Sequence, residues 1–481
     1  MSSLHPLISV IAVVLLLLPA YAAAPAAASS GPTRTPIKHV VIITMENHSF
    51  DNIFGYYPEG GNPLYGNLTS EMSVPADLLS SNHSTGLTAV PSGTFATPDP
   101  VEGYTAYHLD WNGGKMNGFA SNSGKQSMTY YTPSQLAIEW DIAEQYAIAD
   151  MYFSSALTAT MPNRLYEIAG FSPIMNDYGP PPYIPYSETI FSELDSYGVS
   201  WAYYVYSPSM GSIVLDYVSG IPSLQSHLRS WSTFSSEVRN GTLPAVSYLM
   251  PIGIGVSGFS QHPSDNMLAG ELWLLFILHS IMNSPLWNST AVFINYDEGG
   301  GFYDSIPPPR IEGEQLGFRV PLILVSPYAK EDYVSSTVMN HASLLAFIDY
   351  NWMMPPLNTF VALSDVPIDM FTFTSVPGIK PRPPLNLSFR GIRMPSSLHF
   401  SLRSLPTASL ENDYPMVPQF PLESLPYARE GSSSLNLSQM HETPYVRTDR
   451  AYIPVYDSAG FLAFTTVTLS VAAVFLSRKR K

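Results

Sequence analysis

The sequence predicts an α/β fold in which a mainly parallel central sheet is flanked by helices. Short, apolar, β-branched runs such as 39–45, 291–296 and 320–326 have the length and composition of buried strands. Longer segments with helical spacing of apolar residues, such as 265–284 and 341–353, stand between or after these runs. Because strands that alternate with helices form parallel sheets, this order indicates an α/β layer structure.

The elements can be followed along the chain. The first strand is expected over His39–Met45, shortly after Pro36. Residues 55–130 are rich in Gly, Pro, Ser and Asn, and we expect long loops there with little regular structure. The remaining expectations are a helix over 135–149, an extended or irregular segment over 151–159, a helix over 163–169, strands over 244–250, 291–296 and 320–326, and helices over 265–284 and 341–353.

The composition excludes several classes of protein. No cysteine is present, so a disulfide framework, a thiolate metal site and a cysteine nucleophile are impossible. The net charge is -16 and no basic stripe is interleaved with aromatic residues, which argues against nucleic acid as a partner. Charged residues make up 12% of the chain, against roughly 25% in most soluble domains. A surface of hydroxyls and amides stays hydrated when carboxylates are protonated, which favours an acidic external medium.

Apolar segments at both ends predict an extracellular protein anchored to the cell membrane. Leu7–Leu18 has the length of a signal-peptide core, and small residues follow up to Ala28, so 1–28 is the expected signal peptide. A basic region before this run is missing, which leaves an uncleaved anchor as the alternative. Residues 460–477 form a short apolar span before the basic tail 478–481, which predicts a C-terminal transmembrane helix with a cytoplasmic tail.

The chain between these ends divides into two regions. Residues 36–357 carry the strand–helix alternation, whereas proline becomes frequent from about Asn358 to Pro454. We expect 358–458 to be a Pro/Ser-rich extended spacer, with a small β domain as the alternative. Sequons that support an outside location and predict a glycoprotein occur at Asn67, Asn82, Asn240, Asn288, Asn386 and Asn436.

Polar side chains directly follow two of the predicted strands. Glu46 and Asn47 come after "VVIITM", and Asp297 and Glu298 come after "AVFINY". Because ligands gather beyond the carboxyl ends of parallel strands, we expect the two pairs to converge. Three carboxylates and one amide are oxygen donors that suit a hard or borderline divalent cation. Each pair alone is more often a loop cap, so the predicted metal site depends on both.

Thr160 is the candidate nucleophile. It stands in "SSALTATMPNRLYEIAG", where Pro162 suits the first turn of a helix. A hydroxyl beside the positive end of that helix lies where a phosphate binds readily, and a neighbouring divalent cation activates it as an alkoxide. On the local sequence alone, a threonine that caps the helix is the alternative interpretation.

Seven motifs follow one another between about Lys38 and Pro356. They are "MENHSFDNIFG", "HLDWNGGKMNGF", "MTYYTPSQL", "ADMYFSSALTATMPNRLY", "QHPSD", "NSPLWNSTAVFINYDEGGGFYDSIPPP" and "GFRVPLILVSPYAK". In this order they resemble the phosphoesterase family of secreted bacterial phospholipases C and acid phosphatases. The resemblance implies an alkaline-phosphatase-like α/β fold, with 36–357 as a catalytic domain that hydrolyses phosphate esters.

The resemblance also implies a role for individual residues. Glu46, Asn47, Asp297 and Glu298 are similar to the family's metal ligands, and Thr160 to its nucleophile. The bound cation is expected to be Ca, Mn, Mg or Zn, and the sequence leaves its identity open. His108 and His262 look like the histidines that contact phosphate or serve the leaving group. Further positions that match the family near the site, as candidate substrate-binding residues, are Asn163, Arg164, Asp304 and His341.

Four positions depart from the pattern of the family. Gln261, Asn117 and Asn340 stand where relatives commonly have a carboxylate, and Ser305 stands where they have histidine. An amide in place of a carboxylate keeps the shape and removes the titratable charge, which suits an acidic medium. The Ser305 difference leaves the preferred head group open.

The leading prediction is therefore an extracellular, metal-dependent phosphoesterase. Its substrate partner is a phosphate ester, either a phosphomonoester or a phospholipid, and its second partner is the membrane through the C-terminal anchor. The alternative is a catalytically inactive cell-surface or adhesion glycoprotein that retains the fold. The intact set of Glu46, Asn47, Thr160, Asp297 and Glu298 argues against that alternative.

Overall fold

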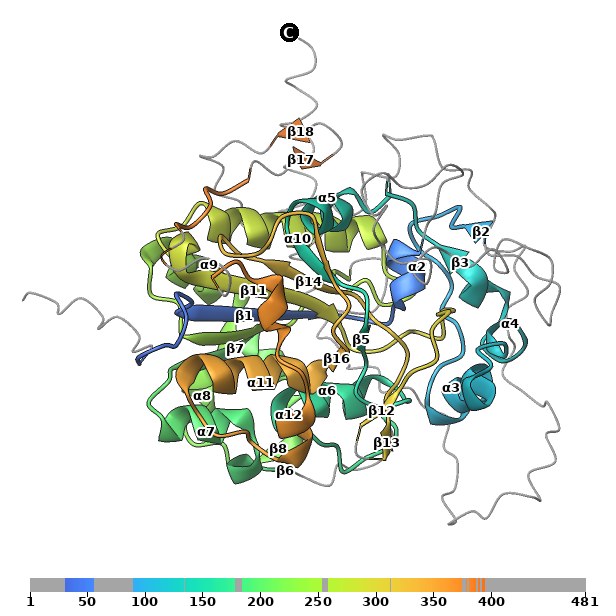
Figure 1. Cartoon of the computed structure of the whole chain (residues 1–481), viewed down its shortest axis with the longest axis horizontal. Helices are drawn as coiled ribbons and strands as arrows, with labels where there is room; N and C mark the ends of the chain where they lie inside the picture. Colours follow the sequence, from blue (N-terminus) through green and yellow to red (C-terminus); the bar gives the residue numbers. More distant parts are fainter. Residues whose placement is uncertain are drawn as a thin grey trace, which may run out of the picture.

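An eight-stranded sheet forms the centre of the computed structural model, with β1 (His39–Met45) in its interior (Figure 1). The strand order is β15-β4-β14-β11-β1-β10-β7-β9. β1 is parallel to both neighbours, whereas β14 is antiparallel to both of its own, so the predicted mainly parallel sheet is confirmed. The other strands of this sheet are β4 (Ala147–Ala149), β7 (Trp201–Val205), β9 (Leu228–Ser230), β10 (Val246–Leu249), β11 (Thr290–Tyr296), β14 (Leu322–Val325) and β15 (Tyr333–Ser335).

The structure describes most of the region from 31 to 393. The described residues are 31–55, 90–133, 135–177, 184–252, 258–311, 313–373, 378, 380–385, 388–389 and 392–393. The predicted signal peptide, most of the predicted spacer, and the predicted anchor and tail lie outside them. Within these ranges, no helix has the length and apolar character needed to cross a bilayer.

Helices cover both faces of the sheet, as Figure 1 shows. One face carries α5 (Ala137–Gln145), α9 (Trp231–Asn240) and α10 (Met267–Met282). The opposite face carries α6 (Thr160–Ala169), α7 (Ile190–Ser196), α11 (His341–Trp352) and α12 (Thr359–Leu363). Every residue of β1 and β11 is buried, because parallel strands covered on both faces are enclosed in the core.

Shorter elements form the end of the molecule beyond the carboxyl end of β1. Two of them, α3 (Tyr104–Trp111) and α4 (Phe119–Asn122), contribute to a second, small apolar cluster, which also includes Leu157, Tyr303 and Phe318. The remaining short elements are distributed over the fold. They are α2 (Phe50–Phe54), β2 (Val90–Pro91), β3 (Thr129–Tyr130), β5 (Tyr152–Phe153), β6 (Ile184–Pro185), β8 (Val218–Ser219), α8 (Leu224–His227), β12 (Arg310–Ile311), β13 (Glu314–Gln315), β16 (Met339–Asn340), β17 (Ser388–Phe389) and β18 (Ile392–Arg393).

The structure corrects three of the expected elements. The expected helix 135–149 ends at Gln145, because 147–149 pairs with β14 and β15 as strand β4. The helix expected over 163–169 begins earlier, at Thr160. The described part of 55–130 contains α3 and α4 rather than long loops, since Tyr107 and Phe119 pack into an apolar cluster.

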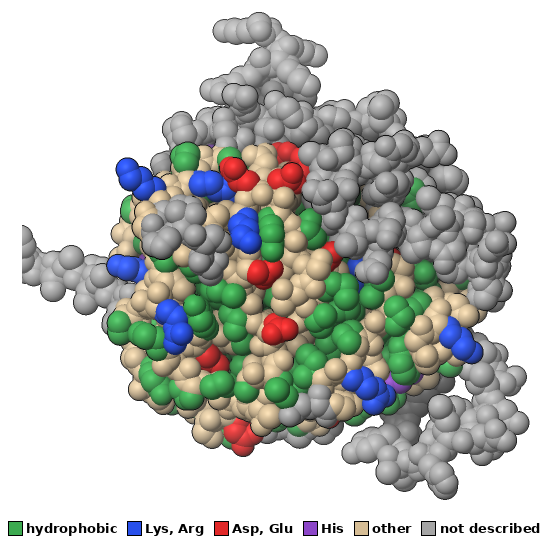
Figure 2. Space-filling model, viewed as in Figure 1, with side chains coloured by type: hydrophobic (Ala, Val, Ile, Leu, Met, Phe, Trp, Pro, Cys, Tyr) green, Lys and Arg blue, Asp and Glu red, His purple; other side chains and the backbone are tan. Residues whose placement is uncertain are grey.

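The visible surface carries few charged side chains. Lys, Arg, Asp and Glu are scattered singly among apolar and uncharged polar side chains in Figure 2. Asn240 and Asn288 are exposed at their sequons, whereas Asn47, which also begins a sequon, is buried. The other sequons lie outside the described residues.

Candidate active site

The register of the central strands brings the two predicted pairs to one edge of the sheet. Met45 lies opposite Tyr296 in the parallel pairing of β1 with β11, so Glu46 and Asp297 follow at the same level. The backbone N–H of Asn47 donates to Asp297 Oδ1 at 3.0 Å. Asn47 has a φ of 62°, a left-handed conformation that asparagine adopts more readily than most residues.

Arg164 joins the two pairs from the adjacent helix α6. Its Nε donates to Asp297 Oδ2 at 3.1 Å, and its Nη2 lies 3.3 Å from Glu46 Oε1. The guanidinium also donates to the carbonyls of Thr44 and Met45. Burial lowers the pKa of Arg164, but the neighbouring carboxylates raise it by more, so the side chain stays charged. Arg164 therefore fixes Glu46 and Asp297 and has little capacity left for a substrate.

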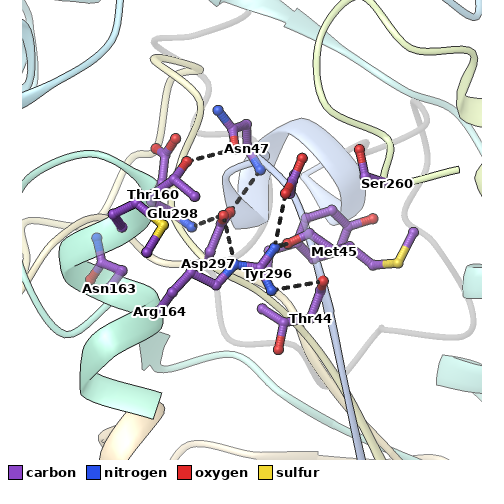
Figure 3. Close-up of polar contacts among 12 residues, drawn as sticks. Thr44, Met45, Asn47, Thr160, Asn163, Arg164, Ser260, Tyr296, Asp297 and Glu298 are labelled. Atoms are coloured by element: carbon purple, nitrogen blue, oxygen red, sulfur yellow. Dashed lines mark hydrogen bonds and ion pairs between the residues drawn. The ribbon is translucent and has the colours of Figure 1, made fainter. Parts of the chain in front are cut away.

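Thr160 is the first residue of α6 and faces these groups. Its hydroxyl points to Asn47 Oδ1 at 3.4 Å, a long contact (Figure 3). The preceding loop is held by Asn163, whose Oδ1 accepts from the N–H of Ala156 at 2.8 Å. The Asn163 amide nitrogen donates to the carbonyls of Ala156, Thr158 and Ala159. Both ends of the Asn163 amide thus position the loop that carries Thr160.

The predicted metal ligands differ in whether their side-chain oxygens are already hydrogen-bonded. Both oxygens of Asp297 are already bonded, since Oδ2 binds Arg164 and Oδ1 accepts from the N–H groups of Asn47 and Glu298. Asn47 Oδ1 has only the long contact with Thr160. Glu298 is fully buried and its Oε1 has no hydrogen-bond partner. An orphaned buried carboxylate oxygen is costly, and a cation would satisfy it, so this part of the donor set fits a metal ion.

Glu102, which no sequence motif singled out, connects several of these groups. Its carboxylate accepts from Asn47 Nδ2 at 2.6 Å and lies against the carboxyl group of Glu298. Tyr107, also not predicted, donates its hydroxyl to Glu298 Oε2 and comes within 3.5 Å of Glu102. Asp99 and Glu102 stand three residues apart just before α3, and this spacing could have indicated a site. It was not used, because residues 55–130 were expected to be loops.

His262 belongs to the same end of the site. Its Nε2 lies 3.7 Å from Glu102 Oε1, and its Nδ1 meets the carbonyl of Pro263. Burial lowers the pKa of His262, but Glu102 and Glu46 raise it, to about 9. Among the described residues, Asp99, Glu102 and His262 are the one group of three whose ligand atoms all lie within 4.8 Å of one another.

His108 is placed differently from His262. Its Nδ1 meets the carbonyl of Tyr104 at 2.8 Å, and its ring contacts those of Tyr104 and Trp111 in the same stretch of α3. These contacts hold the ring against its own helix rather than against Thr160. The predicted catalytic role of His108 stays a prediction.

His341 and Asp304 are buried supports of the site. His341 Nδ1 accepts from the N–H of Ser155 at 3.3 Å, and its Nε2 donates to the carbonyl of Tyr296 at 3.0 Å. Burial lowers the pKa of His341 to about 3, so the ring is neutral and ties the Thr160 loop to the end of β11. Asp304 binds Arg319 Nε at 2.9 Å, and Arg319 also binds Asp51.

The Phosphoesterase family matches residues 37–355 of this chain. The chain belongs to that family. Curated relatives of this phosphoesterase include "Phospholipase C A" of Mycobacterium tuberculosis, 28% identical over 423 residues that cover 71% of this chain and 78% of the relative. "Non-specific phospholipase C1" of Arabidopsis thaliana is 28% identical over 340 residues, which cover 62% of each chain. This phosphoesterase is accordingly a hydrolase of phosphoric esters.

Solved structures resemble it only distantly. A protein in the alkaline phosphatase superfamily from Vibrio parahaemolyticus matches with a TM-score of 0.33 and 9% identity, over 67% of each chain. The lipoteichoic acid synthase LtaP from Listeria monocytogenes matches with a TM-score of 0.36 and 8% identity, over 70% of this chain and 78% of the other. At these scores, nothing about the active site is transferred from either protein.

Proposed function

We propose that this phosphoesterase cleaves its substrate outside the cell through Thr160, with the help of a divalent cation. The observation that carries the proposal is the placement of the Thr160 hydroxyl. It stands at the N-terminus of α6, the positive end of the helix dipole, and it faces the Asn47 amide beyond the ends of β1 and β11. A nucleophile, the positive end of a helix and several oxygen donors thus meet at one point.

The chemistry that we propose has two steps. The Thr160 oxygen attacks phosphorus and gives up its proton, the bond from phosphorus to the leaving oxygen breaks, and the alcohol departs with a proton. Water then attacks phosphorus in the covalent intermediate on Thr160, which keeps the second alcohol if the substrate is a phosphodiester. The bond between phosphorus and the Thr160 oxygen breaks, and the hydroxyl regains a proton. The loop held by Asn163 keeps the attacking oxygen in place between the two steps.

The predicted ligands would hold the cation through Asn47 and Glu298, with Glu46 and Asp297 fixed beside them by Arg164. When bound, a divalent cation neutralises charge on the phosphoryl oxygens and favours the alkoxide form of a nearby hydroxyl. His262 lies at the Glu102 end of the site, and we assign the leaving group to that end because positive charge there balances the departing oxygen.

We propose a phospholipid rather than a phosphomonoester as the substrate. The names of several relatives support this choice, since they are described as phospholipases C from two bacteria and a plant. A phosphodiester also carries one negative charge fewer than a phosphomonoester dianion, which suits a site rich in carboxyl groups.

The proposal is tested with two aryl esters and a pair of Thr160 variants. Purified protein is incubated with p-nitrophenyl phosphorylcholine and with p-nitrophenyl phosphate, with and without a chelator, over a range of pH. We expect release from the phosphodiester, loss of release with chelator, and recovery when metal is restored. Thr160→Ala is expected to lower kcat on the order of 10³-fold or more, whereas Thr160→Ser keeps a hydroxyl and retains measurable turnover.

Two results would contradict the proposal. Equal turnover by Thr160→Ala and the wild-type protein would remove Thr160 as nucleophile. Release from neither ester by folded, metal-repleted protein would favour the inactive adhesion glycoprotein over the enzyme.

A further inference from the structure

A closed ring of hydrogen bonds adjoins the site, among three fully buried side chains. They are Glu139 of α5, Gln261, and Tyr296 at the end of β11. The Tyr296 hydroxyl contacts Glu139 Oε1 and Gln261 Oε1. The Gln261 amide nitrogen donates to Glu139 Oε2 at 3.4 Å, which completes this hydrogen-bond ring. The proposed chemistry uses none of the three side chains, although Gln261 and Tyr296 directly precede His262 and Asp297.

The hydrogens available to the hydrogen-bond ring place a proton on Glu139. A tyrosine hydroxyl has one hydrogen, yet that of Tyr296 touches an oxygen of Glu139 and an oxygen of Gln261. If Glu139 were ionised, Tyr296 would donate to one of these oxygens and face the other without a hydrogen between them. A protonated Glu139 instead donates to the Tyr296 oxygen, and Tyr296 donates to Gln261 Oε1. Every contact of the ring then has its hydrogen.

The surroundings of Glu139 also favour its protonated form. Burial raises the pKa of Glu139 to about 7. Burial and the neighbouring Glu139 raise the pKa of Glu271 on α10 as well. Glu271 accepts from the N–H groups of Ile138 at 2.6 Å and Glu139 at 3.0 Å, two bonds that stabilise a carboxylate, so the proton of this pair stays on Glu139. His48 and Tyr131 also lie near the hydrogen-bond ring, and both stay uncharged because burial lowers the pKa of His48 and raises that of Tyr131.

The segment that carries His262 is fixed through Gln261. Gln261 has a φ of 68°, a left-handed conformation that residues other than glycine rarely adopt. Its carbonyl accepts from His48 Nε2 at 2.7 Å. Gly270 of α10 leaves room for the side chain, because a Cβ there would lie 2.3 Å from Gln261 Cγ. A strained conformation persists only where its surroundings hold it, and the hydrogen-bond ring holds the side chain of Gln261.

We propose that Glu139 is a positioning residue that must be protonated for turnover, because it closes the hydrogen-bond ring that orients His262 toward Glu102. The inference rests on the proposed function, in which His262 lies at the end of the site assigned to the leaving group. When Glu139 loses its proton to solvent, Tyr296 donates to Glu139 and Gln261 Oε1 loses its donor. The strained residue before His262 is then no longer held.

The test is the pH dependence of kcat/KM for p-nitrophenyl phosphorylcholine, measured on the full, metal-loaded chain. In the wild-type protein we expect kcat/KM to fall as the pH rises through about 7, where Glu139 ionises. Glu139→Gln cannot ionise, and its amide donates to Tyr296 and accepts from Gln261, so the ring stays closed at every pH. The fall should then move toward about pH 9, where His262 loses its proton.

A tyrosine pair separates this role from a purely structural one. Tyr296→Phe removes the middle donor of the hydrogen-bond ring, and we expect kcat to fall about 10-fold or more with little change in KM. Tyr131→Phe is the matched control, since it removes another buried hydroxyl, which bonds to Thr97 at 2.7 Å outside the ring. It should keep the kcat and the pH profile of the wild-type protein. Thermal unfolding of each variant shows that it is folded.

Infrared spectra test the proton without turnover. The difference between folded wild-type protein and Glu139→Gln should contain the band of one protonated carboxyl group at about pH 5, and lose it by about pH 9. Absence of this band would overturn the inference. So would an alkaline limit of Glu139→Gln that equals that of the wild-type protein, or a folded Tyr296→Phe with unchanged kcat.

Failure of this inference can be told apart from failure of the proposed function. Turnover that needs Thr160 but has the same pH profile in Glu139→Gln would overturn the positioning role alone. Equal turnover by Thr160→Ala and the wild-type protein, with the profile still shifted in Glu139→Gln, would remove the nucleophile and sustain the positioning role. A folded, metal-repleted protein that cleaves neither aryl ester would overturn both.

Discussion

At the scale of single residues, the site depends on close approaches that few side chains permit. A Cβ placed on Gly300 would lie 1.9 Å from the carbonyl oxygen of Asn47, which a real structure does not allow. Gly300 also has a φ of 62°, where residues other than glycine are strained. The glycines that follow Glu298 therefore let the second pair of ligands approach the first.

This close approach predicts different outcomes for two glycine variants. Gly313 also has a positive φ, but a Cβ there would meet nothing within 4 Å. Gly313→Ala is expected to cost about 1–2 kcal/mol of unfolding free energy and leave kcat unchanged. Gly300→Ala should cost clearly more and abolish activity, because Asn47 must move. Denaturant unfolding and turnover measure both, and equal losses in the two variants would contradict this account of the site.

Site residues that directly follow an apolar strand could be predicted from the sequence. Site residues that reach the others only in the folded chain could not. Glu46, Asn47, Asp297 and Glu298 were found because each pair ends an apolar strand. Glu102 and Tyr107 were missed because they reach the site only when α3 packs against the ends of the strands. The ion pairs of Arg164 with Glu46 and Asp297 could not be predicted either, since they depend on how α6 packs against β1.

At the scale of elements, the strand β1 and the helices α10 and α11 were predicted closely, because long uniform patterns identify them. The predicted helix 135–149 ran too far because its last residues are apolar and pair with β14 and β15, which no local pattern reveals. The strand order, and the antiparallel insertion of β14, depend on contacts distant in sequence. The convergence of Glu46 and Asn47 with Asp297 and Glu298 was nevertheless predicted, because ligands gather beyond the carboxyl ends of parallel strands.

The loop before α6 predicts the behaviour of Asn163 variants. Removing this amide leaves the N–H of Ala156 and buried carbonyls without partners, so Asn163→Ala should cost about 1–3 kcal/mol of unfolding free energy. Since the side chain positions Thr160, kcat should fall while KM changes little. Asn163→Asp keeps the acceptor and loses the donor, and should lie between Asn163→Ala and the wild-type protein. A large rise in KM with kcat unchanged would instead support the predicted role in substrate binding.

At the scale of the whole molecule, buried carboxyl groups set the response to pH. Burial raises the pKa of Asp110, Glu139 and Glu167 to about 7, and that of Asp349 to about 8. Between about pH 4 and pH 7 the folded chain keeps protons that the unfolded chain has released, so stability falls as pH rises. Burial lowers the pKa of His48 to about 4 and of His341 to about 3, which lowers stability as pH falls below about 6.5.

These opposing effects predict that the fold is most stable in a mildly acidic medium. The carboxyl groups outnumber the two histidines, so we expect the midpoint of thermal unfolding of metal-free protein to be higher at about pH 5 than at about pH 8. Calorimetry across this range measures the difference. This result would agree with the sparsely charged surface in Figure 2, whereas a midpoint that rises steadily to pH 8 would contradict the account.

The central claim is that Thr160 carries the phosphoryl group during turnover, and trapping that group tests it most directly. The protein is mixed with a phosphate ester at acidic pH, quenched with acid within the first turnovers, digested, and analysed by mass spectrometry. We predict a phosphoryl group on Thr160, which carries the retained alcohol when the substrate is a phosphodiester, in the peptide that contains "TMPNR". We predict no such group on the corresponding peptide of Thr160→Ala. Steady turnover with an unmodified Thr160, or with the phosphoryl group on another residue, would contradict the account.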